Sequence, residues 1–153
     1  MSWRRRVAVV LLVALSACAG APKLTDDGRR VQRVDAFLGE LDHAYERRDA
    51  TAVMAALSPR FADRDALGRQ IDSTFAEFND IELAFAIERI QLDPETATVY
   101  LRWDGEWRAA GRAPVVRQGA ARFVVETGEH TALAAVLGDT PFGPVSAGSP
   151  IPR

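Results

Sequence analysis

The spacing of the apolar residues changes near residue 80, and this change constrains the fold more than any other feature of the chain. Over residues 31–78 the apolar side chains recur at intervals of three and four, which is typical of one face of a helix. From Ile81 onward they alternate with polar side chains, as in a strand with one buried face. Helices followed by strands joined through short turns predict an α+β domain with an antiparallel sheet.

Three helices are expected in the first half. A long helix of about five turns follows the capping side chains at 25–27, and its apolar stripe covers residues 31–45. Asp49 is expected to end that helix and to cap a short second one. The second helix stops before Pro59, because the residue that precedes a proline avoids the helical region. A third helix fits residues 64–78.

About four strands are expected in the second half, and the alternating segments are 81–92, 97–103, 118–126 and 131–137. The apolar residues change face after Arg89, which predicts a β-bulge. Residues 105–111 are expected to form a hairpin arm. Within it, Trp107 is expected either to contact a partner or the membrane interface, or to cover the sheet edge.

Cys18 is the only cysteine of the chain, and it follows a segment built like an export leader. Arg4, Arg5 and Arg6 precede an apolar run over residues 7–15, and small residues follow. A transmembrane anchor would need roughly 20 apolar residues, more than this run provides. A core helix or a leader with an unmodified cysteine remain the alternatives.

The ending Leu15-Ser16-Ala17-Cys18 resembles the lipobox of bacterial lipoproteins. The resemblance implies that residues 1–17 are a signal peptide and that Cys18 is lipidated. Residues 18–25 would then be the lipidated cysteine and its tether, and the anchor would hold the protein in the cell envelope. Ala19 follows the cysteine where inner-membrane lipoproteins of many double-membraned bacteria carry an aspartate, which implies the outer membrane, facing the periplasm. The host's envelope type is left open.

The charge of the chain argues against a nucleic-acid partner. Lys and Arg number 19 against 21 Asp and Glu, the net charge is −2, and the arginines are scattered among acids. A general basic surface for nucleic acid or anionic lipid is therefore not expected. Residues 144–153 are rich in Pro, Gly and Ser, and we expect a disordered tail there.

Three short segments resemble the nuclear transport factor 2-like (NTF2-like) superfamily, which includes SnoaL-like and ketosteroid-isomerase-like domains. They are residues 45–49 (Tyr-Glu-Arg-Arg-Asp), 57–61 (Leu-Ser-Pro-Arg-Phe) and 138–143, which end in Phe-Gly. The resemblance covers residues 26–143. It implies a curved sheet wrapped around the long helix as a cone with an apolar pocket, and cones that often pair through their sheets into a homodimer.

Enzymes of this superfamily commonly use an aspartate inside the cone, sometimes with a histidine or tyrosine. Such a base needs a carboxylate near an apolar wall, where burial raises its pKa. Few acids are expected at inward positions here. Asp104 and Glu106 lie at a strand end and in the arm, whereas Glu82 and Glu88 are expected to face solvent. No catalytic residue is therefore assigned.

Neither histidine indicates a metal site. His43 lies two residues off the apolar stripe, and His130 lies in a turn, so we expect both at the surface. A histidine ligand normally comes with other ligands at matching spacing, and none are present. The chain has no Gly-rich phosphate loop and no Gly-x-Ser-x-Gly elbow. No metal and no cofactor are expected.

The aromatic residues give a weaker indication of a ligand pocket. Such a pocket would be lined by Tyr45, Phe85, Tyr100, Trp103 and Phe123 around Arg102 or Arg122. Apolar walls with one cation would suit a hydrophobic acid or a lipid-like ligand. The alternative is that these rings fill the core.

Two functions therefore remain. The favoured one is a non-catalytic binding or interaction module, anchored in an envelope membrane and meeting a protein partner or a small apolar ligand. The other is a small acid–base enzyme of the isomerase, dehydratase or cyclase kind. An open cavity with a buried carboxylate facing Tyr45 or Tyr100 would favour the enzyme, and a filled cone would favour the module.

Overall fold

The computed structural model describes residues 24–144. Three helices precede four strands: α1 (Asp26–Glu46), α2 (Ala50–Ala55), α3 (Arg64–Glu77), β1 (Asp80–Leu92), β2 (Thr96–Arg108), β3 (Val115–Thr127) and β4 (Thr131–Gly138). The α+β prediction is confirmed. Cys18, its leader and residues 145–153 of the expected tail lie outside the described residues.

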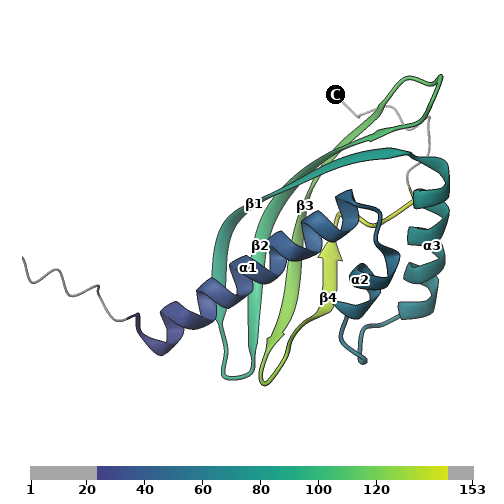
Figure 1. Ribbon diagram of the computed structural model, residues 1–153. Helices are drawn as coiled ribbons and strands as arrows, with labels where there is room; N and C mark the ends of the chain where they lie inside the picture. Colours follow the sequence, from purple (N-terminus) through teal and green to yellow (C-terminus); the bar gives the residue numbers. More distant parts are fainter. Residues whose placement is uncertain (1–23, 145–153) are drawn as a thin grey trace, which may run out of the picture.

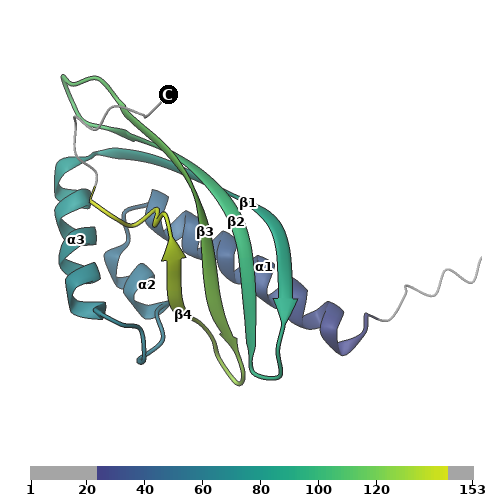
Figure 2. The same cartoon turned by 180° about the vertical axis from the view of Figure 1, so that it is seen from behind.

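The four strands form one antiparallel sheet in the order β1-β2-β3-β4. The sheet is strongly curved, and α1 runs across its hollow face, while α2 and α3 stand beyond β4 (Figures 1 and 2). This is the predicted cone of strands around a long helix. The described helices include none that is long and apolar enough to span a bilayer.

The predicted bulge in β1 is confirmed. The pairing of β1 with β2 shifts register between Ile87 and Arg89, and that of β3 with β4 shifts between Val124 and Val125. An extra residue on one strand bends it and increases its twist. Both shifts therefore support the curvature that lets the sheet enclose α1.

The second strand extends further than predicted, and this corrects the account of Trp107. Residues 105–108 belong to β2, Trp107 pairs with Ile81, and its side chain is 0 % exposed. Gly105, which was expected in the hairpin arm, lies within β2 and makes room for a ring. A Cβ added there would lie 2.5 Å from the Trp107 ring. The expected contact of Trp107 with a partner or the membrane is therefore wrong, and it does not cover the sheet edge either.

Aromatic side chains fill the interior of the cone. Tyr45 is 0 % exposed and packs edge-on against Phe75 and Phe142, with ring centroids 5.1 and 5.2 Å apart. Trp103 and Phe123 are buried on the inner face of the sheet. The rings thus fill the core, as the alternative interpretation predicted.

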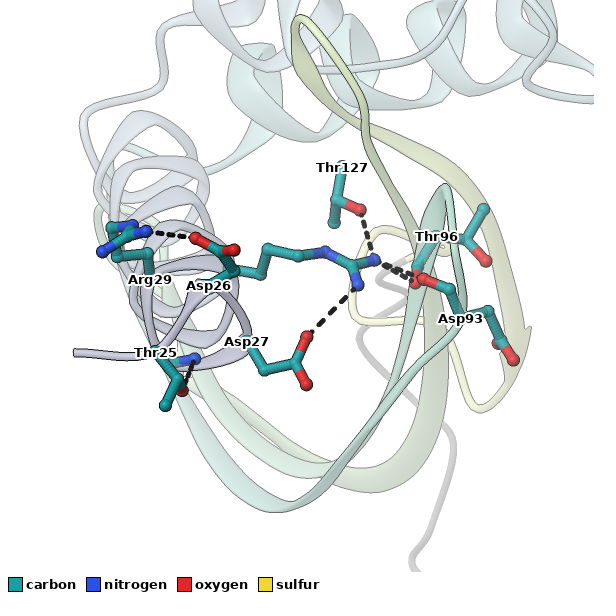
Figure 3. Close-up of polar contacts among 9 residues, drawn as sticks. Thr25, Asp26, Asp27, Arg29, Asp93, Thr96 and Thr127 are labelled. Atoms are coloured by element: carbon teal, nitrogen blue, oxygen red, sulfur yellow. Dashed lines mark hydrogen bonds and ion pairs between the residues drawn. The ribbon is translucent and has the colours of Figure 1, made fainter.

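One arginine, Arg30, fastens the start of α1 to two turns of the sheet. Figure 3 labels its partners Asp27, Asp93, Thr96 and Thr127. Arg30 has a side chain only 17 % exposed. Its partners are the backbone carbonyls of Asp93 and Thr96, the Thr127 hydroxyl (2.9 Å) and the Asp27 carboxylate (3.8 Å). These groups lie at the β1–β2 and β3–β4 turns, so a single side chain joins the helix to both hairpins.

The two outer edges of the sheet, β4 and β1, have different hydrogen-bond partners. On β4, Leu133 donates to the carbonyl of Ala56 and accepts from the amide of Ser58, both at 2.8 Å. On β1, the Glu46 carboxylate of α1 accepts the Leu83 amide at 3.2 Å. The end of α1 therefore closes part of the β1 edge through a charged side chain.

Candidate functional site

The predicted pocket residues do not surround one pocket. Tyr45 and Trp103 point into the filled core, whereas Tyr100 and Arg102 occupy alternate positions of β2 and face the outside. Arg122 pairs with Tyr100 across the β2–β3 ladder and is exposed on the same outer face. Successive residues of a strand point to opposite faces of the sheet, which is the physical reason for the separation.

The outward-facing residues Arg102 and Tyr100 contact charged side chains of β1 instead. Arg102 has a side chain 74 % exposed and pairs with Glu88 at 2.8 Å. The Arg89 guanidinium lies 4.0 Å above the centre of the Tyr100 ring. These contacts describe a solvated outer surface.

The inward residues are tightly held. Trp103 Nε1 donates to the backbone carbonyl of Asp139 at 2.7 Å. Burial raises the pKa of Tyr45 to about 12, and the neighbouring Trp107 and Thr74 side chains offset part of that shift. Tyr45 therefore stays neutral at physiological pH. Within residues 24–144, its hydroxyl and Trp107 Nε1 are buried without a hydrogen bond of normal geometry.

Both histidines lie at the surface, as expected. His43 is 63 % exposed, with Nδ1 3.3 Å from the Glu46 carboxylate, and His130 is exposed in the β3–β4 turn. The described part of the chain contains no group of three or more His, Cys, Asp or Glu side chains placed to hold a metal ion.

Asp42 is the functional candidate that the sequence analysis missed. It lies on α1 beside the buried stripe, four residues after Leu38, and its Oδ1 is buried without a partner among the described residues. Burial raises the pKa of Asp42 to about 7, with a further increase from Glu46 and Asp104 and a partial decrease from His43. Its spacing from Leu38 was a usable signal of burial, because residues four apart share a helix face.

A crevice opens beside Asp42, between α1 and β1. Its volume is about 190 Å³, and it is lined by Asp35, Leu38, Gly39, Asp42, Phe85 and Ile87. The β1 side of the crevice is apolar. The carboxyl of Asp42 therefore lies against the kind of wall that raises the pKa of an acid.

An acidic groove lies at the other end of the same helix flank. Its volume is about 410 Å³, and its lining combines four acidic residues with four small or apolar ones: Glu46, Glu82, Asp104 and Glu106, and Leu83, Ala84, Gly105 and Val116. Arg108 neutralises part of it, because this one guanidinium binds Glu82 (2.7 Å), Asp80 (2.7 Å) and Glu106 (2.9 Å). The three carboxylates raise the pKa of Arg108 above its ordinary value. Asp104 forms no ion pair within the described part of the chain.

Comparisons with known proteins identify the fold. An NTF2-like superfamily protein from Salmonella enterica superposes with a TM-score of 0.65 at 14 % identity, over 83 % of this chain and 99 % of that one. A candidate scytalone dehydratase from Novosphingobium aromaticivorans superposes with a TM-score of 0.65 at 13 % identity, over 82 % of this chain and 95 % of that one. The chain has the NTF2-like fold.

A third similar structure is Bd1075 from Bdellovibrio bacteriovorus, with a TM-score of 0.64 and 11 % identity. The match covers 76 % of this chain and 44 % of Bd1075, so this chain spans less than half the length of that protein. No protein-family model matches the chain, and no curated protein does. At these identities the similarity establishes the NTF2-like fold and nothing about activity.

The chemistry available to this domain lies at the α1 flank. Glu46 and, to a smaller extent, Asp104 lie close enough to raise the pKa of Asp42, and we call these three residues the carboxylate row. A carboxyl that titrates near neutral pH can accept or release a proton under physiological conditions. The carboxylate row is therefore the part of the surface with the most distinctive chemistry.

Proposed function

We propose that this chain is a lipid-anchored binding or interaction module of the bacterial cell envelope, joined to the membrane at Cys18. The observation that carries the proposal is the filled cone. Tyr45, Trp107 and Phe142 are at most 1 % exposed and occupy the interior where a ligand would otherwise lie. A partner or ligand would then meet the outer surface of the domain.

The cavities at the α1 flank support an external site. Small-molecule sites usually enclose about 300–1,000 Å³ and bury most of their ligand. The crevice beside Asp42 is smaller than that, and the acidic groove is bordered by exposed carboxylates such as Glu82, which is 64 % exposed. Both features suit contact with another surface better than enclosure of a small apolar ligand.

The length of the tether and the contacts of Arg30 fit the anchored arrangement. Residues 19–25 can span at most about 25 Å when extended. They lead directly into α1, whose start Arg30 fastens to the β1–β2 and β3–β4 turns. The acidic groove lies at the opposite end of α1, about 30 Å along the helix. Ala19 favours the outer membrane, facing the periplasm.

Membrane fractionation with acyl labelling tests the anchor. In the Cys18→Ala variant, we expect the protein to leave the membrane fraction and to lose its acyl label. A matched control, Ala21→Ser in the tether, keeps the cysteine and should behave as the wild type. Unchanged membrane attachment of Cys18→Ala would contradict the proposal. So would a ligand enclosed in the cone of protein isolated from its own host.

One observation favours the second candidate, an acid–base enzyme. The Asp42 carboxyl has a pKa of about 7 and lies beside apolar Phe85 and Ile87, where a general base is commonly placed. The fold is shared with the candidate scytalone dehydratase described above. Asp42 would then remove a proton from a substrate held over the crevice.

Turnover assays with hydroxylated and keto substrates test this second candidate. Any rate should rise with pH through about 7, because the base must be ionised. It should fall at least about 100-fold in Asp42→Asn. A rate that Asp42→Asn leaves unchanged would exclude Asp42 as the base.

A further inference from the structure

Asp42 lies at a junction of three elements. It projects from α1 into the crevice against Phe85 and Ile87 of β1, and Asp104 of β2 is near enough to raise its pKa. One of its two oxygens is buried and has no partner among the described residues. An ionised carboxylate in this place would lack the hydrogen bonds that normally offset burial.

The charged groups around Asp42 are mostly negative. Glu46 follows one turn later on α1, Asp35 lines the same crevice, and Asp104 approaches from β2. The basic side chains nearby already have acidic neighbours: His43 Nδ1 lies 3.3 Å from the Glu46 carboxylate, and Arg108 pairs with Asp80, Glu82 and Glu106. β1 contributes only Phe85 and Ile87 to the crevice lining. Ionisation of Asp42 therefore adds a like charge to a group of carboxylates.

Glu46 connects this charge to the sheet. Its Oε1 accepts the amide of Leu83 at 3.2 Å, on the outer edge of β1. Leu83 itself is buried, at 3 % exposure. Carboxylates four residues apart on a helix repel each other when both are ionised. Repulsion from Asp42 thus acts directly on the side chain that holds β1 against α1.

We propose that the seam between α1 and β1 is a proton-operated joint, closed while Asp42 carries a proton and loosened when Asp42 ionises. Loosening moves Glu46 away from the Leu83 amide and admits water to the crevice. The half-buried side chains of Phe85 and Ile87, on the inner sheet face, then become more exposed. The inference does not depend on the lipid anchor or on any catalytic role.

The direction of the pH effect follows from proton binding. The closed seam raises the pKa of Asp42 to about 7, whereas in the opened seam the pKa returns toward its ordinary value of 3.8. The closed state therefore binds the proton more tightly. Opening should increase with pH between about 4 and 7, by at most about tenfold per pH unit, and stay constant above that range.

Amide hydrogen exchange of the protein as isolated from its host, in detergent micelles, tests the joint without any substrate. Protection factors, which remove the intrinsic pH dependence of exchange, would be measured for residues 81–87 at several pH values from 5 to 8. In the wild type we expect protection to fall at least about tenfold between pH 5 and pH 7.5. In Asp42→Asn it should stay constant. The matched control Glu40→Gln, an exposed acid of the same helix, should follow the wild type.

Two results would overturn the proposal: constant protection in the wild type, or an unchanged fall in Asp42→Asn. If Asp42→Asn does not fold, a ¹³C NMR titration of the Asp42 carboxyl in the wild type decides the question. A midpoint near 7 that coincides with the change in exchange supports the joint. A midpoint below about 5 overturns it, because the carboxyl would then be ionised across the whole range.

Discussion

At the scale of single residues, Asp42 should make the stability of the domain depend on pH. A raised folded-state pKa contributes stability that is complete below the unfolded pKa, near 4, and is lost as the pH rises through about 7. Asp42→Asn removes the ionisable group. It should be more stable than the wild type at pH 8 by about 1–2 kcal/mol, a value reduced for the partial exposure of the carboxyl.

Urea unfolding at pH 4 and pH 8 measures this difference. The gain should be present at pH 8 and should largely disappear at pH 4, where the wild-type carboxyl is protonated in the folded state and about half protonated in the unfolded state. A variant that is equal to or less stable than the wild type at pH 8 would show that Asp42 is not buried as described.

Gly105 gives a second prediction at this scale. A Cβ there would lie 2.5 and 2.8 Å from two atoms of the buried Trp107 ring. Gly105→Ala should therefore lower the free energy of unfolding by about 1–3 kcal/mol, as overpacking of a core does. Chemical denaturation measures the loss.

The matched control for Gly105 is Gly39→Ala. Nothing lies within 4 Å of an added Cβ at this exposed position of α1. The change should stabilise the protein by about 0.5–1 kcal/mol, because alanine favours the helix more than glycine does. Equal effects at the two positions would contradict the close packing of Gly105 against Trp107.

At the scale of elements, α1 is held at its start by Arg30. Arg30→Met keeps much of the apolar stem but leaves the carbonyls of Asp93 and Thr96 without this donor. Charge-assisted hydrogen bonds of this kind contribute about 1.5–3 kcal/mol each, and water can replace part of them here. We expect a total loss of about 1–3 kcal/mol in thermal or urea unfolding.

Arg33→Met is the control for Arg30→Met, since Arg33 is exposed on the same helix. It should change the free energy of unfolding by less than about 0.5 kcal/mol. If the two variants unfold alike, Arg30 does not join α1 to the hairpins.

Element order and type could be predicted from the sequence because they depend on local periodicity. The three helices, the four strands and the bulge near Arg89 follow from the spacing of apolar residues alone. Trp107 could not be assigned correctly in this way. The sequence placed Gly105 and Trp107 in a hairpin arm, and only the packed sheet shows that the missing side chain of Gly105 accommodates the Trp107 ring.

The candidate site was less predictable because it is formed between elements. Strand alternation alone should have separated Tyr100 and Arg102 from Trp103, since neighbouring strand residues face opposite ways. Asp42 presents a different difficulty. Its burial depends on Phe85 and Ile87, which are distant in sequence and reach α1 only through the curvature of the sheet.

At the scale of the whole molecule, we propose that a cone with the NTF2-like fold, filled by its own aromatic side chains, is carried on a short lipid tether. The proposed tether would lead into α1 at the end where Arg30 joins both hairpins, and the carboxylate row lies nearer the other end of the helix. The chemistry is therefore expected on the outer flank of α1, directed toward partners in the envelope. Lipidation of Cys18 is the central claim of this arrangement.

The most direct test of that claim is the intact mass of the protein extracted from the membranes of its own host. We predict a mature chain that begins at Cys18 and carries diacylglycerol on the cysteine sulfur. The added mass should be absent from the Cys18→Ala protein. A chain that begins at another residue, or at Cys18 with an unmodified thiol, would contradict the account.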